Sequence, residues 1–174
     1  RGDHHPAVTA LGKMGPPAAA AVPLLVKALQ HESSSLRYEA ARALSALGPL
    51  ASGAVPELIA MLRGSAGVSS YASLALVNTG LESVQPLLAE IGKGDPSSRE
   101  KAISIIGRIG PRAREAIPVL ISIVKDKEDA RLKESAALAL ASLGPEARGT
   151  VPVLVSAFFL FRRLVKLGFC LFRL

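Results

Sequence analysis

The sequence predicts an all-α protein, a solenoid of about five two-helix repeats. The first observation is a series of glycines at nearly constant spacing, with 33, 32, 30 and 34 residues between successive members. The second is that a proline directly follows four of them, and another proline comes eight residues after the same four. A repeat of this length is the signature of a helical solenoid. The five glycines are Gly15, Gly48, Gly80, Gly110 and Gly144.

The first helix of each repeat is predicted by apolar residues that share one face. Counted back from the glycine, positions −8, −4 and −1 carry these residues, and this spacing returns to the same side of a helix. Alanine at −8 lets neighbouring helices approach closely, and the branched residues fill the layer between repeats. Glycine suits the left-handed position that ends a helix, and the following proline cannot continue it. The three sets are Ala7, Ala40, Ala72, Ala102 and Ala136; Leu11, Leu44, Leu76, Ile106 and Leu140; and Met14, Leu47, Thr79, Ile109 and Leu143.

The second helix of each repeat is expected to begin near the second proline. A proline in the first turn costs little, because its missing N–H would have no intrahelical partner there. Counted from this proline, positions −1, +2, +3 and +6 are apolar and share one face. They hold Val22, Val55, Ile117 and Val151 at −1; Leu25, Leu58, Leu120 and Leu154 at +2; Val26, Ile59, Ile121 and Val155 at +3; and Leu29, Leu62, Val124 and Phe158 at +6.

These helix pairs divide the chain into a repeat array over 1–157 and a different segment over 158–174. We expect the repeats at about 1–33, 34–66, 67–96, 97–129 and 130–157. The third repeat departs from the pattern, because Leu81 replaces the first proline and Pro86 comes six residues after Gly80 instead of eight. Its linker is therefore two residues shorter, which predicts a kink or a change of curvature in the middle of the array.

The block from Arg37 to Leu62 is the most regular copy and points to a known family. It reads R-x-x-A-x-x-A-L-x-x-L-G-P and then A-V-P-x-L-I-x-x-L, and Arg99 to Val124 follows the same pattern less closely. The pattern resembles HEAT repeats, especially the short type of phycobilisome-lyase-like proteins, over about residues 4–158. The resemblance implies a right-handed stack of helical hairpins that binds other macromolecules, with the second helices lining the concave surface.

The C-terminal segment differs in composition, because all five Phe lie between residues 158 and 172. On a helix its basic residues would form a narrow stripe on a wide apolar body. The segment either extends the last helix onto the open end of the array, or forms a membrane-surface or partner-docking helix, or is an altered gene end. The uncharged run of 11 residues at 151–161 is too short for a membrane span, which needs about 20. The second interpretation uses Phe158, Phe161, Arg162, Arg163, Lys166, Phe169 and Phe172.

Charge and composition argue against several classes of partner. The net charge is +7, but residues 157–174 contribute +4 and the rest of the chain only +3. Acidic residues interrupt the basic ones in the fourth repeat, and Tyr38 and Tyr71 are the only tyrosines, so we do not expect nucleic acid binding. One cysteine excludes an intrachain disulfide. Nothing requires an oxidising compartment, so we expect the cytoplasm, although the residues themselves leave the compartment open.

No set of residues predicts catalysis. The three histidines are His4, His5 and His31, near the chain's edge or a helix end, and Cys170 lies in the C-terminal segment. The glutamates fall mostly on solvent-facing repeat positions, rather than in pairs suited to acid–base chemistry. No Gly-rich phosphate loop occurs. We therefore expect no enzyme activity, no metal and no cofactor.

A protein partner is expected on the outer side of the second helices. Positions +1 and +4 from the proline lie opposite the buried positions, and the +1 row holds four aliphatic residues. If this row is exposed, it forms a shallow apolar groove for a peptide or helix. The alternative is that it packs against the neighbouring repeat. The predicted contact residues are Leu24, Lys27, Glu57, Leu87, Glu90, Val119, Ser122 and Val153.

The leading hypothesis is therefore a non-catalytic scaffold that binds a protein through its second helices. One alternative is an accessory component of a lyase-type enzyme. It rests only on the resemblance to phycobilisome-lyase-like proteins, and the lack of His or Cys in the repeat core counts against it. The other alternative is adhesion to a membrane surface or to nucleic acid, through basic residues and the segment 158–174.

Overall fold

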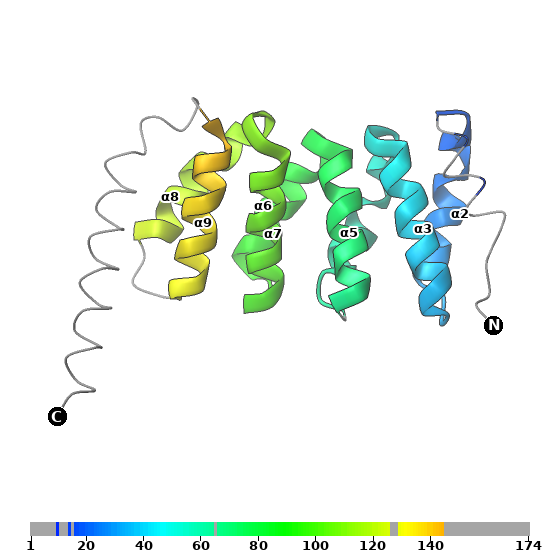
Figure 1. Ribbon diagram of the computed structural model, residues 1–174, viewed down its shortest axis with the longest axis horizontal. Helices are drawn as coiled ribbons and strands as arrows, with labels where there is room; N and C mark the ends of the chain where they lie inside the picture. Colours follow the sequence, from blue (N-terminus) through cyan, green and yellow to red (C-terminus); the bar gives the residue numbers. More distant parts are fainter. Residues whose placement is uncertain (1–9, 11–13, 15, 65, 126–128, 145–174) are drawn as a thin grey trace.

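The computed structural model is an array of short helices in two layers (Figure 1). It describes residues 10, 14, 16–64, 66–125 and 129–144. One layer holds the A helices, which are α3 (Ser34–Leu47), α5 (Ala66–Thr79), α7 (Pro96–Ile109) and α9 (Ala130–Ser142). The other layer holds the B helices, which are α2 (Val22–Leu29), α4 (Val55–Met61), α6 (Val84–Lys93) and α8 (Ile117–Lys125). These ranges contain no strand, and the prediction of an all-α solenoid is confirmed.

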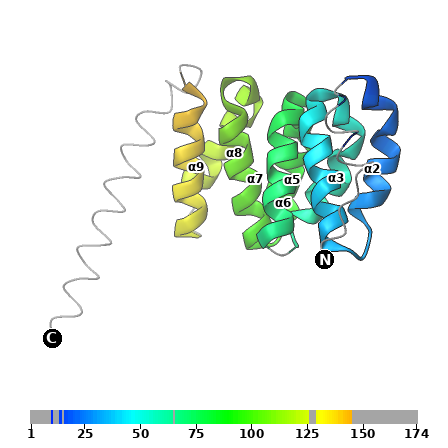
Figure 2. The ribbon, with the colours of Figure 1, turned by 45° about the vertical axis from the view of Figure 1, so that its right-hand side comes forward.

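Short 3₁₀ segments lead into the B helices. They are η1 (Pro16–Ala21), η2 (Gly48–Ala54), η3 (Gly80–Ser83) and η4 (Gly110–Ala116). Each B helix packs against the A helix that follows it, and each A helix packs against the next A helix. Figure 2 shows this stacking from another side, with α2 beside α3 at the N-terminal end. Each layer therefore runs the length of the array.

The repeat glycines end the A helices, as predicted. Gly48 and Gly110 have φ/ψ of 57°/−129° and 73°/−147°. The φ values are positive, but the ψ values lie outside the left-handed helical region that we expected for a helix-ending residue. The combination of φ and ψ observed at Gly48 and Gly110 is one that essentially only glycine adopts. The change of direction from an A helix into its 3₁₀ segment therefore depends on the missing side chain.

Polar side chains begin three of the A helices. The Ser33 hydroxyl accepts a hydrogen bond from the backbone N–H of Leu36, at 3.4 Å. The Asp95 carboxylate accepts two, from the N–H groups of Ser97 and Ser98 at 3.0 and 3.1 Å. Asp129 accepts one from the N–H of Arg131 at 2.9 Å. These contacts satisfy N–H groups that have no partner within the first turn of a helix.

Two arginines bind backbone carbonyls at the other end of the B helices, Arg37 in the turn just after α2 and Arg99 in the last turn of α6. Arg37 donates to the carbonyl oxygens of His31 and Glu32, at 2.6 and 2.7 Å. Arg99 stands at the same repeat position and donates to the carbonyl of Ile91 at 2.8 Å. A cation at a helix C-terminus pairs with carbonyl groups that lack intrahelical partners. The arginine of the repeat pattern therefore ties α3 and α7 to the backbone that precedes them, whereas α5 and α9 hold Ser69 and Lys133 at this position.

The core lies between the two layers and contains most of the positions that the repeat pattern predicted, but Met14 is 57% exposed and Val26, Ile59 and Ile121 are only half-buried. Alanines at −8 and branched residues at −4 of the A helices are fully buried, and so is the fourth residue of every B helix. Burying this apolar surface contributes about 25 cal/mol per Å². The residues are Ala40, Ala72, Ala102 and Ala136; Leu44, Leu76, Ile106 and Leu140; and Leu25, Leu58, Leu87 and Leu120.

The third repeat differs more than its prolines suggested. Its 3₁₀ segment η3 has four residues, whereas η2 and η4 have seven, so the linker is three residues shorter and not two. Pro86 is the third residue of α6, whereas Pro56 and Pro118 are the second residues of their helices. Proline is tolerated throughout the first turn of a helix. Counting from Pro86 therefore placed every position of α6 one residue too late. The last residue of η3, Ser83, is buried, and its hydroxyl has no hydrogen-bond partner among the residues that the structure describes.

The A layer is packed unevenly. A methyl group on Gly107 of α7 would lie 2.9 Å from the Cα atom of Ala139, so α7 and α9 approach closely at a glycine. Ser45 of α3 occupies the same repeat position and accepts hydrogen bonds from the Asn78 amide of α5. At the middle interface this position holds the larger Val77, and α5 and α7 contact each other less extensively than the other two A-helix pairs. The predicted kink at this place stays a prediction.

One stretch of the array is apolar enough to be compared with a membrane span. By length and composition alone, Ser34–Met61 qualifies, with a mean hydropathy of 1.3. In the structure this stretch is α3, η2 and α4, and it is interrupted at Gly48, where φ is 57°. Its leucines Leu44 and Leu58 are fully buried against other helices. The stretch is one repeat of the array, and its apolar residues are accounted for by the core.

Candidate functional site

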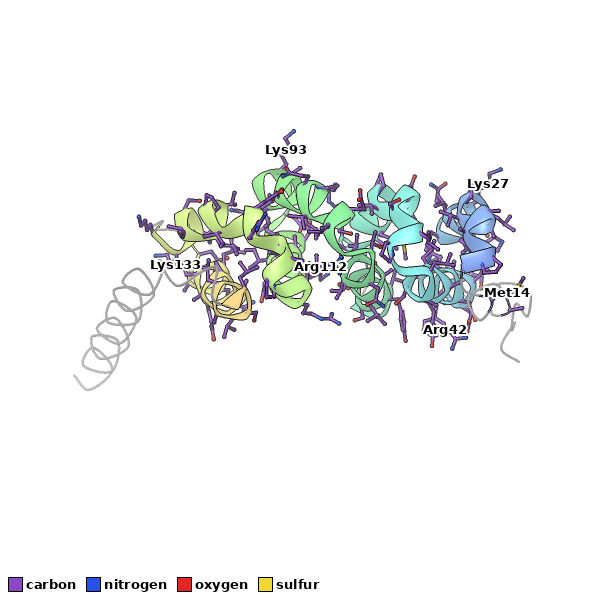
Figure 3. All side chains as sticks on the ribbon, turned by 90° about the horizontal axis from the view of Figure 1, so that it is seen from above. Met14, Lys27, Arg42, Lys93, Arg112 and Lys133 are labelled. Atoms are coloured by element: carbon purple, nitrogen blue, oxygen red, sulfur yellow. The ribbon has the colours of Figure 1, made fainter. Side chains whose placement is uncertain are left out.

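The outer face of the B helices is a surface shared by four successive repeats. The sixth residue of each B helix is exposed, and three of these four side chains are small. Figure 3 shows Lys27 and Lys93 pointing away from the array on this side, whereas Arg42 lies on the side of the A helices. We call this surface the outer B face. Its row of sixth residues is Lys27, Ala60, Ala89 and Ser122.

The structure exposes only part of the predicted partner-binding set. Leu24, which is 60% exposed, lies on the outer B face with Lys27 and Ser122. Glu57 and Val119 are half-buried. Val153 lies outside the described residues.

Two members of the set are buried, so the interpretation as an exposed groove fails at these positions, and Leu87 packs within the array as the alternative allowed. Leu87 is 0% exposed and Glu90 is 6% exposed. The physical reason is the shifted position of Pro86, which places Leu87 at the core position of Leu58 and Leu120. In α6 the exposed sixth residue is Ala89. The prediction missed it because positions were counted from the proline. The first three B helices begin with a valine, at Val22, Val55 and Val84. Counting from this valine would have identified Ala89.

Glu90 joins the second and third repeats through a paired hydrogen bond. Its two carboxylate oxygens accept from Nε and Nη2 of Arg63, at 3.1 and 2.8 Å. The Arg63 side chain remains 55% exposed, whereas that of Glu90 is buried. The hydrogen bond from Arg63 lowers the pKa of Glu90 below its ordinary value, burial opposes this, and the Ser98 hydroxyl adds to the lowering. Arg63 is therefore held in one orientation at the edge of the outer B face.

The turn after α6 is built closely around this carboxylate. A methyl group on Gly94 would lie 2.5 Å from the Ser98 hydroxyl oxygen and 2.6 Å from a carboxylate oxygen of Glu90. Any side chain at this position would clash with these atoms, so the residue has to be glycine. Next to it, the N–H and hydroxyl of Ser98 lower the pKa of Asp95 below its usual value. This cluster is structural, because each polar group contacts a neighbour in the turn.

The charges around the outer B face have both signs. Within the four B helices the exposed charged side chains are Lys27, Lys93 and Lys125, and the exposed Arg63 and Asp95 come two residues after α4 and α6. The two carboxylates of these helices are Glu57, which is half-buried, and Glu90, which is buried and paired with Arg63. Each described repeat therefore presents one cation on this side.

The A layer contains the two tyrosines. The rings of Tyr38 on α3 and Tyr71 on α5 meet edge to face with centroids 4.0 Å apart, and the guanidinium of Arg42 lies 6.0 Å from the Tyr38 centroid. Burial raises the pKa of Tyr71. The two rings therefore pack against each other between A helices, on the side away from the outer B face.

Groups suited to catalysis or metal binding are not brought together in the part of the chain that the structure describes. Within it, no cluster of three or more His, Cys, Asp or Glu side chains could hold a metal ion. His31 lies in the turn after α2 and accepts a hydrogen bond from the Ser33 N–H at 3.1 Å. The predicted residues of the C-terminal segment, Phe158, Phe161, Arg162, Arg163, Lys166, Phe169 and Phe172, lie outside the described residues.

This two-layer stack of helix pairs defines the chain as an α-solenoid. It belongs to the family of HEAT repeats, whose family model matches residues 5–76 and 84–158. The gap between the two matches falls in the third repeat, where the short linker η3 lies. The resemblance to HEAT repeats is therefore confirmed.

The comparison with solved structures agrees with this fold. The chain is similar to an engineered protein, target OR329 of the Northeast Structural Genomics Consortium, whose crystal structure matches with a TM-score of 0.51. The two sequences are 23% identical, and the match covers 87% of this chain and 77% of the other. At this identity the likeness concerns the fold alone. No curated protein matches the sequence significantly.

Proposed function

We propose that the protein is a non-catalytic scaffold that binds a partner protein on the outer B face. HEAT repeats typically serve as protein-interaction scaffolds, and membership of that family supports the general role. The observation that carries the choice of face is the row of exposed sixth residues, in which Ala60, Ala89 and Ser122 are small. Small side chains in line across three helices allow a partner's backbone to approach the array closely.

Some details of this proposal are more specific than membership of the HEAT repeat family. We infer repeats of the short, phycobilisome-lyase-like type, because the spacing of 30 to 34 residues between repeat glycines supports that subtype. We also propose a cytoplasmic location, since the single cysteine fits a reducing compartment. The predicted contact residues Leu24, Lys27 and Ser122 remain in the proposed site, and Ala60 and Ala89 join them.

Site-specific photo-crosslinking in the source cell tests the choice of face. A photoreactive amino acid at Ala60 or Ala89 should give a discrete protein adduct. The matched control positions are Ser104 and Leu138, which are exposed at equivalent positions of the A helices. Adducts from the A positions alone, or equal adducts from both sides, would contradict the proposal.

A further inference from the structure

The first repeat exposes an apolar residue at a position that the other described repeats bury. Met14 stands one residue before the repeat glycine and is 57% exposed. In the next four repeats the residue at this position is at most 9% exposed. These four residues are Leu47, Thr79, Ile109 and Leu143. The difference belongs to the place of Met14 in the array, because its repeat position is otherwise a core position.

The B layer shows the same difference at two further positions. The residue directly before the B helix is half-buried at Ala21 but fully buried in the next three repeats. The third residue of the B helix is 60% exposed at Leu24 but half-buried in the next three. The compared residues are Ala54, Ser83 and Ala116 for the first position and Glu57, Pro86 and Val119 for the second.

A hydrogen bond between repeats shows which neighbour covers this side of a B helix. Arg63, two residues after α4, donates to Glu90 at 3.1 and 2.8 Å, and Glu90 is the seventh residue of α6. The seventh residue of a B helix therefore faces the preceding repeat. The third residue lies on the same side, because residues four apart are neighbours on a helix. In α2 these two residues are Leu24 and Ala28.

The exposed positions form one apolar end of the array. Figure 3 shows Met14 and Lys27 at the same end, with Met14 on the side of the A helices. We call Met14, Ala21, Leu24 and Ala28 the N-terminal end face. None of these four residues is charged or polar, so the face offers nothing to an ionic ligand. The terminal repeats of solenoids usually carry a polar outer face, and an apolar face across both layers suits an interface instead.

A second copy of this chain is the occupant that fits this face. In the later repeats the same positions are covered by another helix pair of the same type, so the face continues an interface that recurs within the array. A second copy brings such a helix pair at its own N-terminal end. Most homo-oligomers use one patch on both subunits, related by a two-fold axis. With the two α2 helices antiparallel, the A layers of both copies lie on one side and the B layers on the other.

The side chains of α2 are self-complementary in this arrangement. When the antiparallel helices cross midway between residues 24 and 28, each Leu24 meets Ala28 of the other copy. A large residue opposite a small one lets two helices interdigitate. The array itself does not require a small residue here, because the seventh residue is Met61 in α4 and Ile123 in α8. Ala28 therefore leaves space that Leu24 of a second copy can fill.

We propose that the N-terminal end face joins two copies of this chain into a symmetric dimer, in which Leu24 of each copy packs against Ala28 of the other. This interface goes beyond the proposed function, because it lies at the end of the array. The outer B faces of the two copies remain free, and both lie on the same side of the dimer.

Sedimentation velocity of the full chain, over micromolar to millimolar concentrations, tests the dimer. We expect an equilibrium between monomer and dimer, and Leu24→Lys should weaken it at least about tenfold by placing a charge in the interface. The matched control Leu138→Lys changes a leucine of α9 that is 64% exposed, and it should alter association by less than about twofold. A chain that stays monomeric, or equal weakening by both substitutions, would overturn the proposal. Growth beyond the dimer would also overturn it, because a symmetric contact closes.

Exchange of the two facing residues tests the register. Leu24→Ala removes the large residue, and Ala28→Leu sets two leucines against each other, so each substitution alone should weaken the dimer at least about tenfold. The double variant places each leucine opposite an alanine again and should associate within about threefold of the native chain. Circular dichroism checks that all variants keep their helical content. A double variant that is no better than the single ones would refute the antiparallel contact.

The phenylalanine-rich segment 158–174 provides a competing explanation for self-association. If Phe161→Lys and Phe169→Lys abolish the dimer while Leu24→Lys does not, the contact lies in that segment and the inference is wrong. The proposed function fails separately. Adducts with a different protein at Ala60 or Ala89, together with a chain that stays monomeric, would keep the scaffold and reject the dimer.

Discussion

At the scale of single residues, Glu90 shows how burial changes the meaning of a charged side chain. On the repeat pattern it was a contact residue for a partner, but in the structure it holds Arg63 from within the array. A buried carboxylate is tolerated only when it is paired and hydrogen-bonded. Glu90 therefore acts on the outer B face indirectly, by orienting Arg63.

The stability contributed by Glu90 should depend on pH. Its pKa in the folded state lies below its ordinary value, so the contribution is present above the ordinary glutamate pKa of about 4.3 and is lost as the pH falls through the lowered value. At pH 7, Glu90→Gln should cost about 1.5–3 kcal/mol, the range for hydrogen bonds to charged groups. Urea unfolding at pH 7 and at about pH 3 should show this difference shrinking toward zero.

A neighbouring glutamate provides the control for this measurement. Glu57→Gln alters a half-buried residue of α4 and should change stability by less than about 0.5 kcal/mol. If the difference between Glu90→Gln and the native chain stays constant across the pH range, the pair with Arg63 contributes nothing through its charge.

At the scale of helices, close packing in the A layer depends on the residue three positions before the repeat glycine. Glycine at this position lets α7 touch the backbone of α9, and serine accepts the Asn78 amide in the α3 and α5 pair. Interiors are packed so densely that one added methyl group is felt. The uneven packing of the A layer thus follows from three side chains of different size.

Substitution of two glycines by alanine tests this account. Gly107→Ala should lower the free energy of unfolding by about 1–3 kcal/mol, because the new methyl group meets a backbone atom that cannot move away. Gly92→Ala in α6 has open space around it and should raise stability by about 0.5 kcal/mol through helix propensity. Thermal or urea unfolding compares the two. Equal effects of both substitutions would show that the close approach of α7 and α9 is not required.

At the scale of the whole molecule, the array is two closely packed pairs of repeats joined at a less extensive interface. The α5 and α7 contact is the weaker one in the A layer. Polar side chains bridge this junction, because Gln85 donates to Glu115 at 2.8 Å and Lys101 donates to the carbonyl of Leu62 at 2.6 Å. In a solenoid each repeat is stabilised by its neighbours, so the weakest interface is where the array should bend.

Distances between spin labels on the A helices should reveal this junction. Exposed positions six residues before the repeat glycines offer matched sites at Arg42, Leu74, Ser104 and Leu138. After Cys170→Ala, double cysteine variants can be labelled and measured by electron paramagnetic resonance. The pair at Leu74 and Ser104 should give a longer and broader distance distribution than the pairs at Arg42 and Leu74 or at Ser104 and Leu138. Three similar distributions would contradict the account.

The candidate site could be predicted only where the repeat is regular. Leu24, Lys27 and Ser122 lie in copies with the usual proline and are exposed, whereas Glu57 and Val119 lie in such copies and are half-buried. In the third copy the proline is one residue deeper in the helix, and every position counted from it was displaced. A proline restrains only the first turn of a helix, so it locates a helix start to within a residue, which is too coarse to assign a face.

The sequence by itself determined the pairs of helices and the positions that fill the core. Glycine, proline and alanine act through local constraints on backbone angles and on the closest approach of two helices, so their recurrence is readable without neighbours. Only the tertiary structure decided the frame of α6, the pairing of Arg63 with Glu90 and the looser contact of α5 with α7. These features depend on contacts between side chains that are about one repeat apart in the sequence. Which of these side chains meet is decided by how whole helices pack.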